Sequence, residues 1–150
     1  MKLLSIRFKN INALKGTHEV DFTKPPLSEA GLFAITGPTG SGKTTLLDVI
    51  CLALYNQVPR LGKISKNTIE QAGAILTRHT DEAMAEVTYT CSKGTYTSRW
   101  SISTARTGNL RDYEMQISKD GGALLDLKKR EVPATNESLI GLTYDQFIRS

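Results

Sequence analysis

The residues with the clearest chemical potential form one short, glycine-rich segment of the chain. It runs Gly37, Pro38, Thr39, Gly40, Ser41, Gly42, Lys43, Thr44, which matches the pattern G-x-x-x-x-G-K-[S/T]. Glycine adopts backbone angles that a Cβ atom forbids, so the N–H groups of such a loop can curl around an anion. A helix that begins at the end of the loop adds the positive end of its dipole. The segment therefore predicts a loop that binds the phosphates of a nucleotide.

Three side chains at the end of this segment have predicted roles. Lys43 is expected to reach the β- and γ-phosphates and is the candidate catalytic residue. Thr44 is expected to place its hydroxyl on Mg²⁺, and Thr45 is expected to contact the α-phosphate. The alternative is an ordinary glycine-rich turn with an incidental lysine. The flanking sequence disfavours that alternative, because a buried strand is predicted before the loop and an amphipathic helix after it.

Two predicted elements position the loop. Residues 31–36 form a nearly continuous apolar run, which is typical of a strand covered on both faces. From Lys43 to about Asn56 apolar residues recur at helical spacing, and Pro59 is expected to stop the helix. This strand–loop–helix order is the one that phosphate binding by such a loop requires.

Alternation of apolar and polar residues predicts antiparallel strands elsewhere in the chain. Residues 4–8 and 18–22 predict an opening hairpin. From about Ala83 a strand meander is predicted, and its last hairpin turns at Asp120-Gly121 into a strand at residues 123–125. Together these elements predict an α/β fold with a mixed sheet, a helix after the phosphate-binding loop and an antiparallel β-meander.

The composition is that of a soluble globular domain. The chain has 150 residues, of which 39% are hydrophobic and 23% are charged, so one domain is expected. No window reaches the roughly 18 apolar residues that a membrane span needs, and the N-terminus lacks the apolar stretch of a signal peptide. We therefore predict a cytoplasmic protein with no membrane partner. Cys51 and Cys91 have no metal-ligand spacing and are interpreted as small hydrophobic residues.

Some motifs of complete nucleotide hydrolases are missing after the loop. Residues 45–150 contain neither D-x-x-G nor N-K-x-D, the patterns of a GTPase. No apolar run ends in a Walker B carboxylate either. The nearest approach is residues 123–126, which follow a hairpin turn and are interpreted as the end of a strand. The catalytic half of the enzyme is therefore expected to lie outside this sequence.

A longer segment around the loop carries a family resemblance. Residues 31–55, GLFAITGPTGSGKTTLLDVICLALY, resemble the N-terminus of the SbcC family, the ATPase subunits of SbcCD nucleases. This family is related to SMC proteins and to the ABC ATPases. The resemblance spans essentially the whole chain and includes Lys9-Asn10, Leu14-Lys15-Gly16, Asp21-Phe22, Pro59-Arg60, Leu76-Thr77-Arg78, Ala85-Glu86-Val87 and residues 141–147.

The resemblance implies an architecture and a set of cofactors. It implies that residues 1–150 are the N-terminal part of a split, ABC-type ATPase head, a half-head with the P-loop NTPase fold. The coiled coil and the C-terminal lobe of such a head are absent from the sequence. In the family that lobe supplies the signature motif and Walker B, and two heads enclose two ATP molecules. ATP and Mg²⁺ are the implied cofactors.

The resemblance also implies a function and its partners. The expected function is an ATPase that acts in the processing of DNA double-strand ends and regulates an associated exo- and endonuclease. Hydrolysis is expected to require the missing lobe and a second head, so the fragment alone is expected to be inactive. The expected partners are an SbcD-like nuclease subunit, the C-terminal lobe of the same chain, a second head in a homodimer, and DNA without sequence preference.

Two further sets of residues have roles that the resemblance implies. Asn10, Asn12, Thr77 and Arg78 are expected near the nucleotide base and ribose, and the alternative is ordinary turn and loop chemistry. A second set is expected to form a basic face for DNA phosphates, and the alternative is a solvated strand face. This set lies in a stretch without acidic residues and comprises Lys93, Arg99, Arg106 and Arg111.

Two other functions are compatible with the loop. One is a different phosphate-transferring enzyme, such as a small-molecule kinase. The long β-meander disfavours it, because kinases usually resume parallel βα units after the loop helix. The other is a non-catalytic module that binds DNA or a partner, with nucleotide as a structural ligand.

Overall fold

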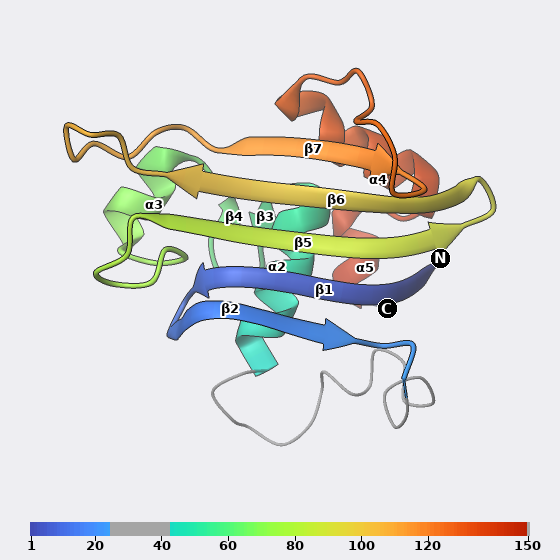
Figure 1. The fold of residues 1–150 in the computed structure, drawn as a ribbon, viewed down its shortest axis with the longest axis horizontal. Coiled ribbons are helices and arrows are strands. Elements are labelled where there is room, and N and C mark those ends of the chain that lie inside the picture. The colour runs from blue at the N-terminus through green and yellow to red at the C-terminus, as the bar shows by residue number, and fades with distance from the viewer. Residues whose placement is uncertain (25–42, 150) are drawn as a thin grey trace.

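The computed structural model describes residues 1–24 and 43–149 of the chain. The strand predicted at residues 31–36 and the loop glycines lie outside the described residues. The described part contains one five-stranded sheet, a two-stranded hairpin and several helices, and Figure 1 shows their arrangement.

The sheet has the strand order β2-β1-β5-β6-β7, and every strand pair in the described part is antiparallel. The strands are β1 (Lys2–Ile11), β2 (Leu14–Asp21), β5 (Glu82–Cys91), β6 (Gly94–Ser103) and β7 (Glu114–Lys119). Two hairpins, β1–β2 and β5–β6, are joined by pairing between β1 and β5. The predicted opening hairpin is therefore confirmed, and so are the first three strands of the predicted meander. The mixed character of the sheet depended on the strand at 31–36 and stays a prediction.

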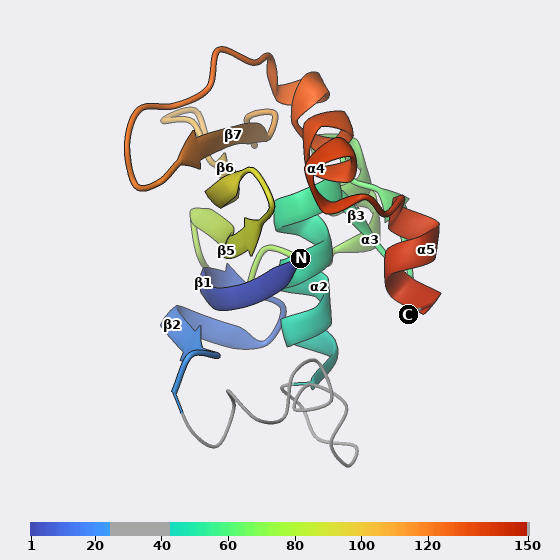
Figure 2. The same cartoon turned by 90° about the vertical axis from the view of Figure 1, so that its right-hand side faces the viewer.

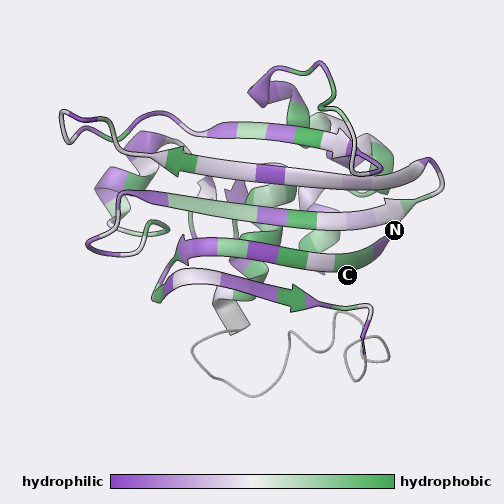
Figure 3. Ribbon diagram, viewed as in Figure 1, coloured by the Kyte–Doolittle hydropathy of each residue, from purple (hydrophilic) through white to green (hydrophobic). Residues whose placement is uncertain are grey.

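The period-two pattern of the strands separates a buried face from an open one. On β1, Ile6 and Phe8 are buried while Arg7 is exposed. On β6, Ser98 and Trp100 are buried, and Arg99 between them lies on the open face. Successive strand residues point to opposite faces, so apolar and polar segments alternate along β1 and β7 in Figure 3.

The helices cover one face of this sheet, and Figure 2 shows them on the same side when the sheet is viewed along its edge. They are α2 (Lys43–Tyr55), α3 (Lys66–Ala72), α4 (Val132–Ile140) and α5 (Tyr144–Arg149), with a 3₁₀ turn, η2, at Lys129–Glu131. Helix α2 lies against β1, β5 and β6 on one side and against α4 on the other. Every residue from Val49 to Tyr55 is therefore buried, although the sequence pattern predicted a helix with one polar face.

Helix α2 ends within one residue of the predicted end, for a local reason. Its last residue is Tyr55, and Asn56 adopts a left-handed conformation with a φ of 55°. The Asn56 side chain is held there, because its amide nitrogen donates to the carbonyl of Ile64 and its oxygen accepts from Trp100 Nε1, both at 2.9 Å. The chain then forms a small hairpin of β3 (Gln57–Val58) and β4 (Gly62–Lys63). Pro59 lies in that hairpin, beyond the end of the helix.

Buried side chains cap the last carbonyls of α2. Ser98 Oγ donates to the Ala53 carbonyl at 2.6 Å. Asn136 Nδ2 of α4 donates to the Leu54 carbonyl at 2.9 Å, and its Oδ1 accepts from the Tyr89 hydroxyl at 2.6 Å. Helix-end carbonyls lack partners within the helix, so these bonds join α2 to the sheet and to α4.

Two expectations fail in the described part of the chain. Residues 123–125 form no strand; after the turn at Asp120-Gly121 only an isolated bridge joins Leu124 to Ser118, and Leu124 is 56% exposed. The sequence supplied the turn but too few alternating residues after it. The family resemblance also led us to expect an exposed apolar surface where the C-terminal lobe would dock. No such surface is found among the described residues, whose exposed large hydrophobic residues are Met1, Leu124 and Ile148, on three separate segments. No helix in residues 1–24 and 43–149 has the length and apolar character needed to cross a membrane.

Candidate functional site

The start of α2 is where the predicted phosphate-binding segment enters the described structure. Gly37 to Gly42 lie outside the described residues. The backbone of Lys43 and Thr44 forms the beginning of α2, as the loop-to-helix arrangement requires. The roles predicted for these two side chains stay predictions. The first side chain of the site that the structure describes is Thr45, which is 3% exposed.

A pocket of about 630 Å³ lies beside this first turn of α2. The turn between β1 and β2 and the segment before β5 form its other walls. Its lining residues are Asn12, Ala13, Thr45, Arg60, Gly73, Ala74, Ile75, Leu76, Thr77 and Arg78. The pocket therefore brings together Asn12, Thr45, Thr77 and Arg78, which the sequence assigned to nucleotide binding from three distant segments.

Asn12 is the residue that connects the β1–β2 turn to α2. It adopts a φ of 54°, a conformation that asparagine tolerates better than most residues. Its Nδ2 donates to Thr45 Oγ1 at 3.2 Å and to Asp48 Oδ2 at 2.9 Å. Its backbone N–H donates to the Ile75 carbonyl at 2.7 Å. These bonds fix the turn against both neighbouring walls of the pocket.

Asp48 is a carboxylate in the interior of α2 with only 1% of its side chain exposed. A buried charge is costly unless it is paired and hydrogen-bonded. Here Asp48 Oδ2 accepts from Asn12 and from Arg60 Nη2, the latter at 3.2 Å. The Arg60 side chain is 53% exposed, so its other guanidinium donors face the pocket and solvent.

Asp48 and Arg60 were missed as functional residues in the sequence. A signal for them existed: an acidic residue on the apolar stretch of a predicted buried helix needs a cationic partner. The sequence gave no indication of which cation that would be.

Thr77 and Arg78 form the far wall of the pocket. The segment is held to the first hairpin, because the Thr77 N–H donates to the Asn10 carbonyl at 3.0 Å. Thr77 is 8% exposed, and its hydroxyl is buried without a hydrogen-bond partner among the described residues. Arg78 is exposed and forms no ion pair with them. Thr77 and Arg78 thus form a wall of the pocket that carries an exposed cationic side chain.

The lining chemistry fits an anion that also carries an apolar part. Among the described residues, Arg60 and Arg78 are the charged residues of the lining, and no carboxylate lines it. Ala74, Ile75 and Leu76 supply apolar surface between them. The volume lies within the usual range of small-molecule sites. These properties are those of a site for an anionic small molecule.

Asn10 does not belong to this pocket, and its predicted contact with the nucleotide is corrected. Its side chain is 6% exposed and is occupied within the fold. The oxygen accepts from the Gly16 N–H at 2.7 Å, and the nitrogen donates to the Glu82 carbonyl at 2.9 Å. The alternative of ordinary turn chemistry is correct at this position, because Asn10 also has a positive φ of 53°.

The predicted basic face is interrupted by acidic residues from neighbouring strands. Arg99 Nε donates to Glu86 Oε2 at 2.9 Å, and Glu86 also lies 3.8 Å from Arg7. Strand pairing thus places acids beside a stretch that contains none in sequence. Lys93 lies in the β5–β6 turn, whereas Arg106 and Arg111 follow the far end of β6. They therefore do not form one face.

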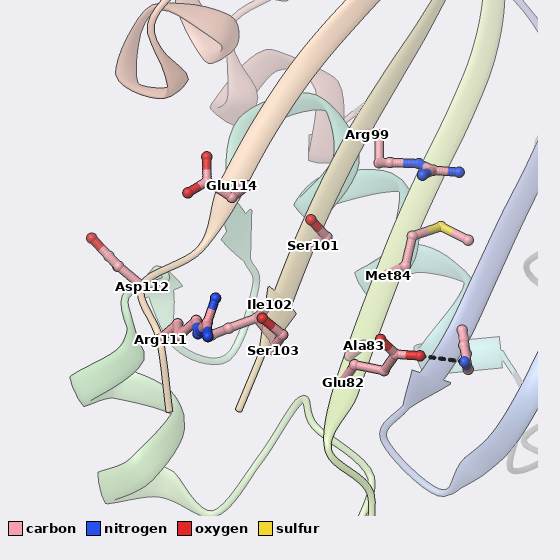
Figure 4. Close-up of a pocket in the computed structure, with 11 residues that line it drawn as sticks. Glu82, Ala83, Met84, Arg99, Ser101, Ile102, Ser103, Arg111, Asp112 and Glu114 are labelled. Atoms are coloured by element: carbon pink, nitrogen blue, oxygen red, sulfur yellow. Dashed lines mark hydrogen bonds and ion pairs between the residues drawn. The ribbon is translucent and has the colours of Figure 1, made fainter. Parts of the chain in front are cut away.

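A hollow of about 380 Å³ on the open face of the sheet has mixed charge (Figure 4). Lys9 forms an ion pair with Glu82 at its margin. Arg111 and Glu114 also line the hollow and form no ion pair among the described residues. In the pocket beside α2, by contrast, the charged residues in the described part of the lining are both arginines.

Comparison with known families decides the classification. Residues 5–149 match a family model described as an AAA domain. The chain belongs to this family. It is also similar to the SbcC subunit of the SbcCD nuclease from Pseudomonas aeruginosa, with 39% identity over all of this chain and 14% of the relative. The corresponding protein of Rhodobacter capsulatus is 37% identical over all of this chain and 13% of the relative.

A third relative comes from a differently named group. The probable DNA double-strand break repair Rad50 ATPase of Aquifex aeolicus is 42% identical over 62 residues, which are 41% of this chain and 6% of the relative. The resemblance to SbcC inferred from the sequence is confirmed. The chain spans about one seventh of the length of the first two curated relatives.

Proposed function

We propose that the chain is the ATP-binding N-terminal lobe of a DNA-end-processing ATPase. In this proposal residues 1–150 are one part of a split, ABC-type head with the P-loop NTPase fold, and the head regulates an associated exo- and endonuclease. The observation that carries the proposal is the pocket beside the start of α2. Its described lining carries two arginines and no carboxylate, and it adjoins the helix start at which the G-x-x-x-x-G-K-T pattern ends.

The residues would divide the nucleotide between them as follows. The loop from Gly37 to Gly42 and Lys43 would hold the β- and γ-phosphates, and Thr44 would hold Mg²⁺. Thr45 would contact the α-phosphate. Asn12 and Arg78 would line the ribose and base side, since both lie in the pocket. Mg²⁺, when bound, supplies charge neutralisation at the phosphates.

The names of the relatives support the cellular role. They are described as the SbcC subunit of the nuclease SbcCD and as a Rad50 ATPase of DNA double-strand break repair. We infer that the whole protein acts with an SbcD-like nuclease subunit and forms a homodimer of heads. Hydrolysis would then require the C-terminal lobe of the same protein and the second head, and this fragment alone would be inactive.

Contact with DNA would be independent of sequence. Arg106 and Arg111 support this, because both are exposed and neither forms an ion pair among the described residues. Such residues attract phosphates without reading bases.

Equilibrium binding of Mg²⁺-ATP to the intact protein that contains this chain tests the proposal. Lys43→Ala is expected to weaken binding about tenfold to a hundredfold, since a hydrogen bond to a charged group contributes about 1.5–3 kcal/mol. Lys63→Ala removes an exposed lysine of β4 outside the pocket and is the matched control. Equal affinities of the wild type and the Lys43 variant would refute the proposal.

A further inference from the structure

We propose that Asp48 is a positioning residue that acts through Asn12 to make the Thr45 hydroxyl a hydrogen-bond donor to the α-phosphate of the bound nucleotide. The inference rests on the proposed function and deepens it. It concerns three described side chains that touch one another and lie at or beside the pocket.

The first step is the orientation of the Asn12 amide. A carboxylate only accepts hydrogen bonds, whereas an asparagine side chain has one accepting and one donating end. Asp48 lies 2.9 Å from one end of the Asn12 amide, so that end has to be the nitrogen. Asp48 thereby fixes which end of Asn12 faces α2.

The second step is the direction of the Thr45 hydroxyl. The same Asn12 nitrogen lies 3.2 Å from Thr45 Oγ1 and donates to it. A threonine hydroxyl has one proton and two lone pairs. With one lone pair engaged by Asn12, its proton is directed elsewhere, and Thr45 donates to no acceptor among the described residues. Thr45 lines the cationic pocket, so a nucleotide phosphate oxygen is the acceptor that this arrangement awaits.

The third step is the role of Arg60. The carboxylate of Asp48 is almost completely buried and would be unstable as an uncompensated charge. Arg60 Nη2, at 3.2 Å from Asp48 Oδ2, supplies that compensation. Without a charged carboxylate the Asn12 amide could turn over and present its oxygen to Thr45, which would then direct its proton to Asn12 and away from the pocket.

The inference makes a quantitative prediction about coupling. Asn12→Gly removes the amide and suits the positive φ at this position, and Thr45→Val removes the hydroxyl at nearly constant shape. Each change is expected to weaken ATP and ADP binding to the intact protein by about tenfold, because both nucleotides carry the α-phosphate. The double variant should bind clearly more tightly than the product of the two single losses implies, since both changes remove one shared interaction. Thr45→Ser should restore wild-type affinity.

Asp48→Asn tests whether Asp48 sets the orientation of the Asn12 amide and thereby the direction of the Thr45 hydroxyl. It is expected to weaken nucleotide binding about tenfold in the wild type and to have no further effect in Thr45→Val. A purely structural role for Asp48 predicts the opposite, the same factor in both backgrounds. If Asp48→Asn does not yield folded protein, nucleotide binding by the single and double variants of Asn12 and Thr45 still tests the proposal. These variants leave the Asp48–Arg60 ion pair in place.

The outcomes separate this inference from the function on which it rests. Losses that multiply to about a hundredfold in the double variant would overturn the proposed relay from Asp48 through Asn12 to Thr45, as would unchanged affinity in either single variant. If Lys43→Ala still weakened binding in the same assay, the nucleotide site would stand and only the relay would fail. If Lys43→Ala had no effect, the proposed function and the relay would fail together.

Discussion

The polar cluster at the end of α2 allows a stability prediction with a magnitude. Asn136 has no exposed surface and forms three side-chain hydrogen bonds: with the Tyr89 hydroxyl at 2.6 Å, and with the Leu54 carbonyl and Ser98 Oγ at 2.9 Å each. Asn136→Ala leaves the Tyr89 hydroxyl and the Leu54 carbonyl buried and unpaired. Ser98 is less affected, because it still donates to the Ala53 carbonyl.

Each unsatisfied buried group costs about 1–3 kcal/mol, so the two groups together cost about 2–6 kcal/mol. Alanine is the better helix former and returns roughly 0.5–0.7 kcal/mol. We therefore expect Asn136→Ala to lower the free energy of unfolding by about 2–5 kcal/mol. Domains of this kind have a total stability of about 5–15 kcal/mol, so the loss is a large fraction of the total.

Urea unfolding of the chain measures this loss. Trp100 is the chain's single tryptophan and is fully buried, so its fluorescence reports unfolding of the core. Asn109→Ala changes the same residue type at an exposed position and should alter stability by less than about 0.5 kcal/mol. A loss below about 1 kcal/mol in Asn136→Ala, with an unchanged urea dependence, would refute the argument that this cluster holds α2 in place.

Three further predictions follow from burial and charge. Tyr144→Phe should leave the stability unchanged or raise it by up to about 1 kcal/mol, because the buried hydroxyl has no partner among the described residues; urea unfolding measures it. Burial raises the pKa of the Cys51 thiol to about 12, so a thiol reagent at pH 8 should modify the half-buried Cys91 well before Cys51. The hydrogen bond between Lys129 and Asp112 lowers the pKa of the Asp112 carboxyl and raises the pKa of the Lys129 ammonium. Asp112→Asn should therefore cost about 0.2–1 kcal/mol at pH 7. That cost should disappear as the pH falls below about 3.8 through the lowered pKa of Asp112, or rises above about 10.5 through the raised pKa of Lys129.

Controls for these predictions come from the same chain. Tyr55→Phe should lower the free energy of unfolding by about 1 kcal/mol, because the Tyr55 hydroxyl donates to the Leu142 carbonyl at 2.8 Å. Equal effects of the two tyrosine changes would contradict the assignment of the Tyr144 hydroxyl as unpaired. Equal reactivity of the two thiols in the native state would contradict the burial of Cys51. A cost of Asp112→Asn that persists in acid would show that the ion pair is not its source.

Local patterns in the sequence were sufficient to predict most of the helices and long strands that the structure describes. Alternation at Ile6 and Phe8 predicted β1, and the helical spacing after Lys43 predicted α2. These elements follow from residues close in the chain, where periodicity and turn chemistry act. The prediction of a strand at residues 123–125 was wrong, because three apolar residues after a turn are too short a pattern to specify strand pairing.

Contacts between residues distant in the chain could not be predicted from the sequence pattern. Asp48 and Arg60 meet because a hairpin returns the chain to the side of α2, and Asn12 reaches both α2 residues from another hairpin. The pairing of Arg99 with Glu86 depends on the register of β5 and β6, which opposes these two residues directly. Asn12 and Arg78, for which the family resemblance implied a shared site, both line the pocket beside α2. The resemblance gave no account of the hydrogen bonds that hold these segments there.

The most direct test of the central claim is ATP turnover by this chain, alone and mixed with the separately expressed C-terminal lobe of the intact protein. We predict turnover only in the mixture, and its loss when the chain carries Lys43→Ala. Robust turnover by residues 1–150 alone that depends on Lys43 would contradict the account, because the catalytic machinery would then be complete within this chain.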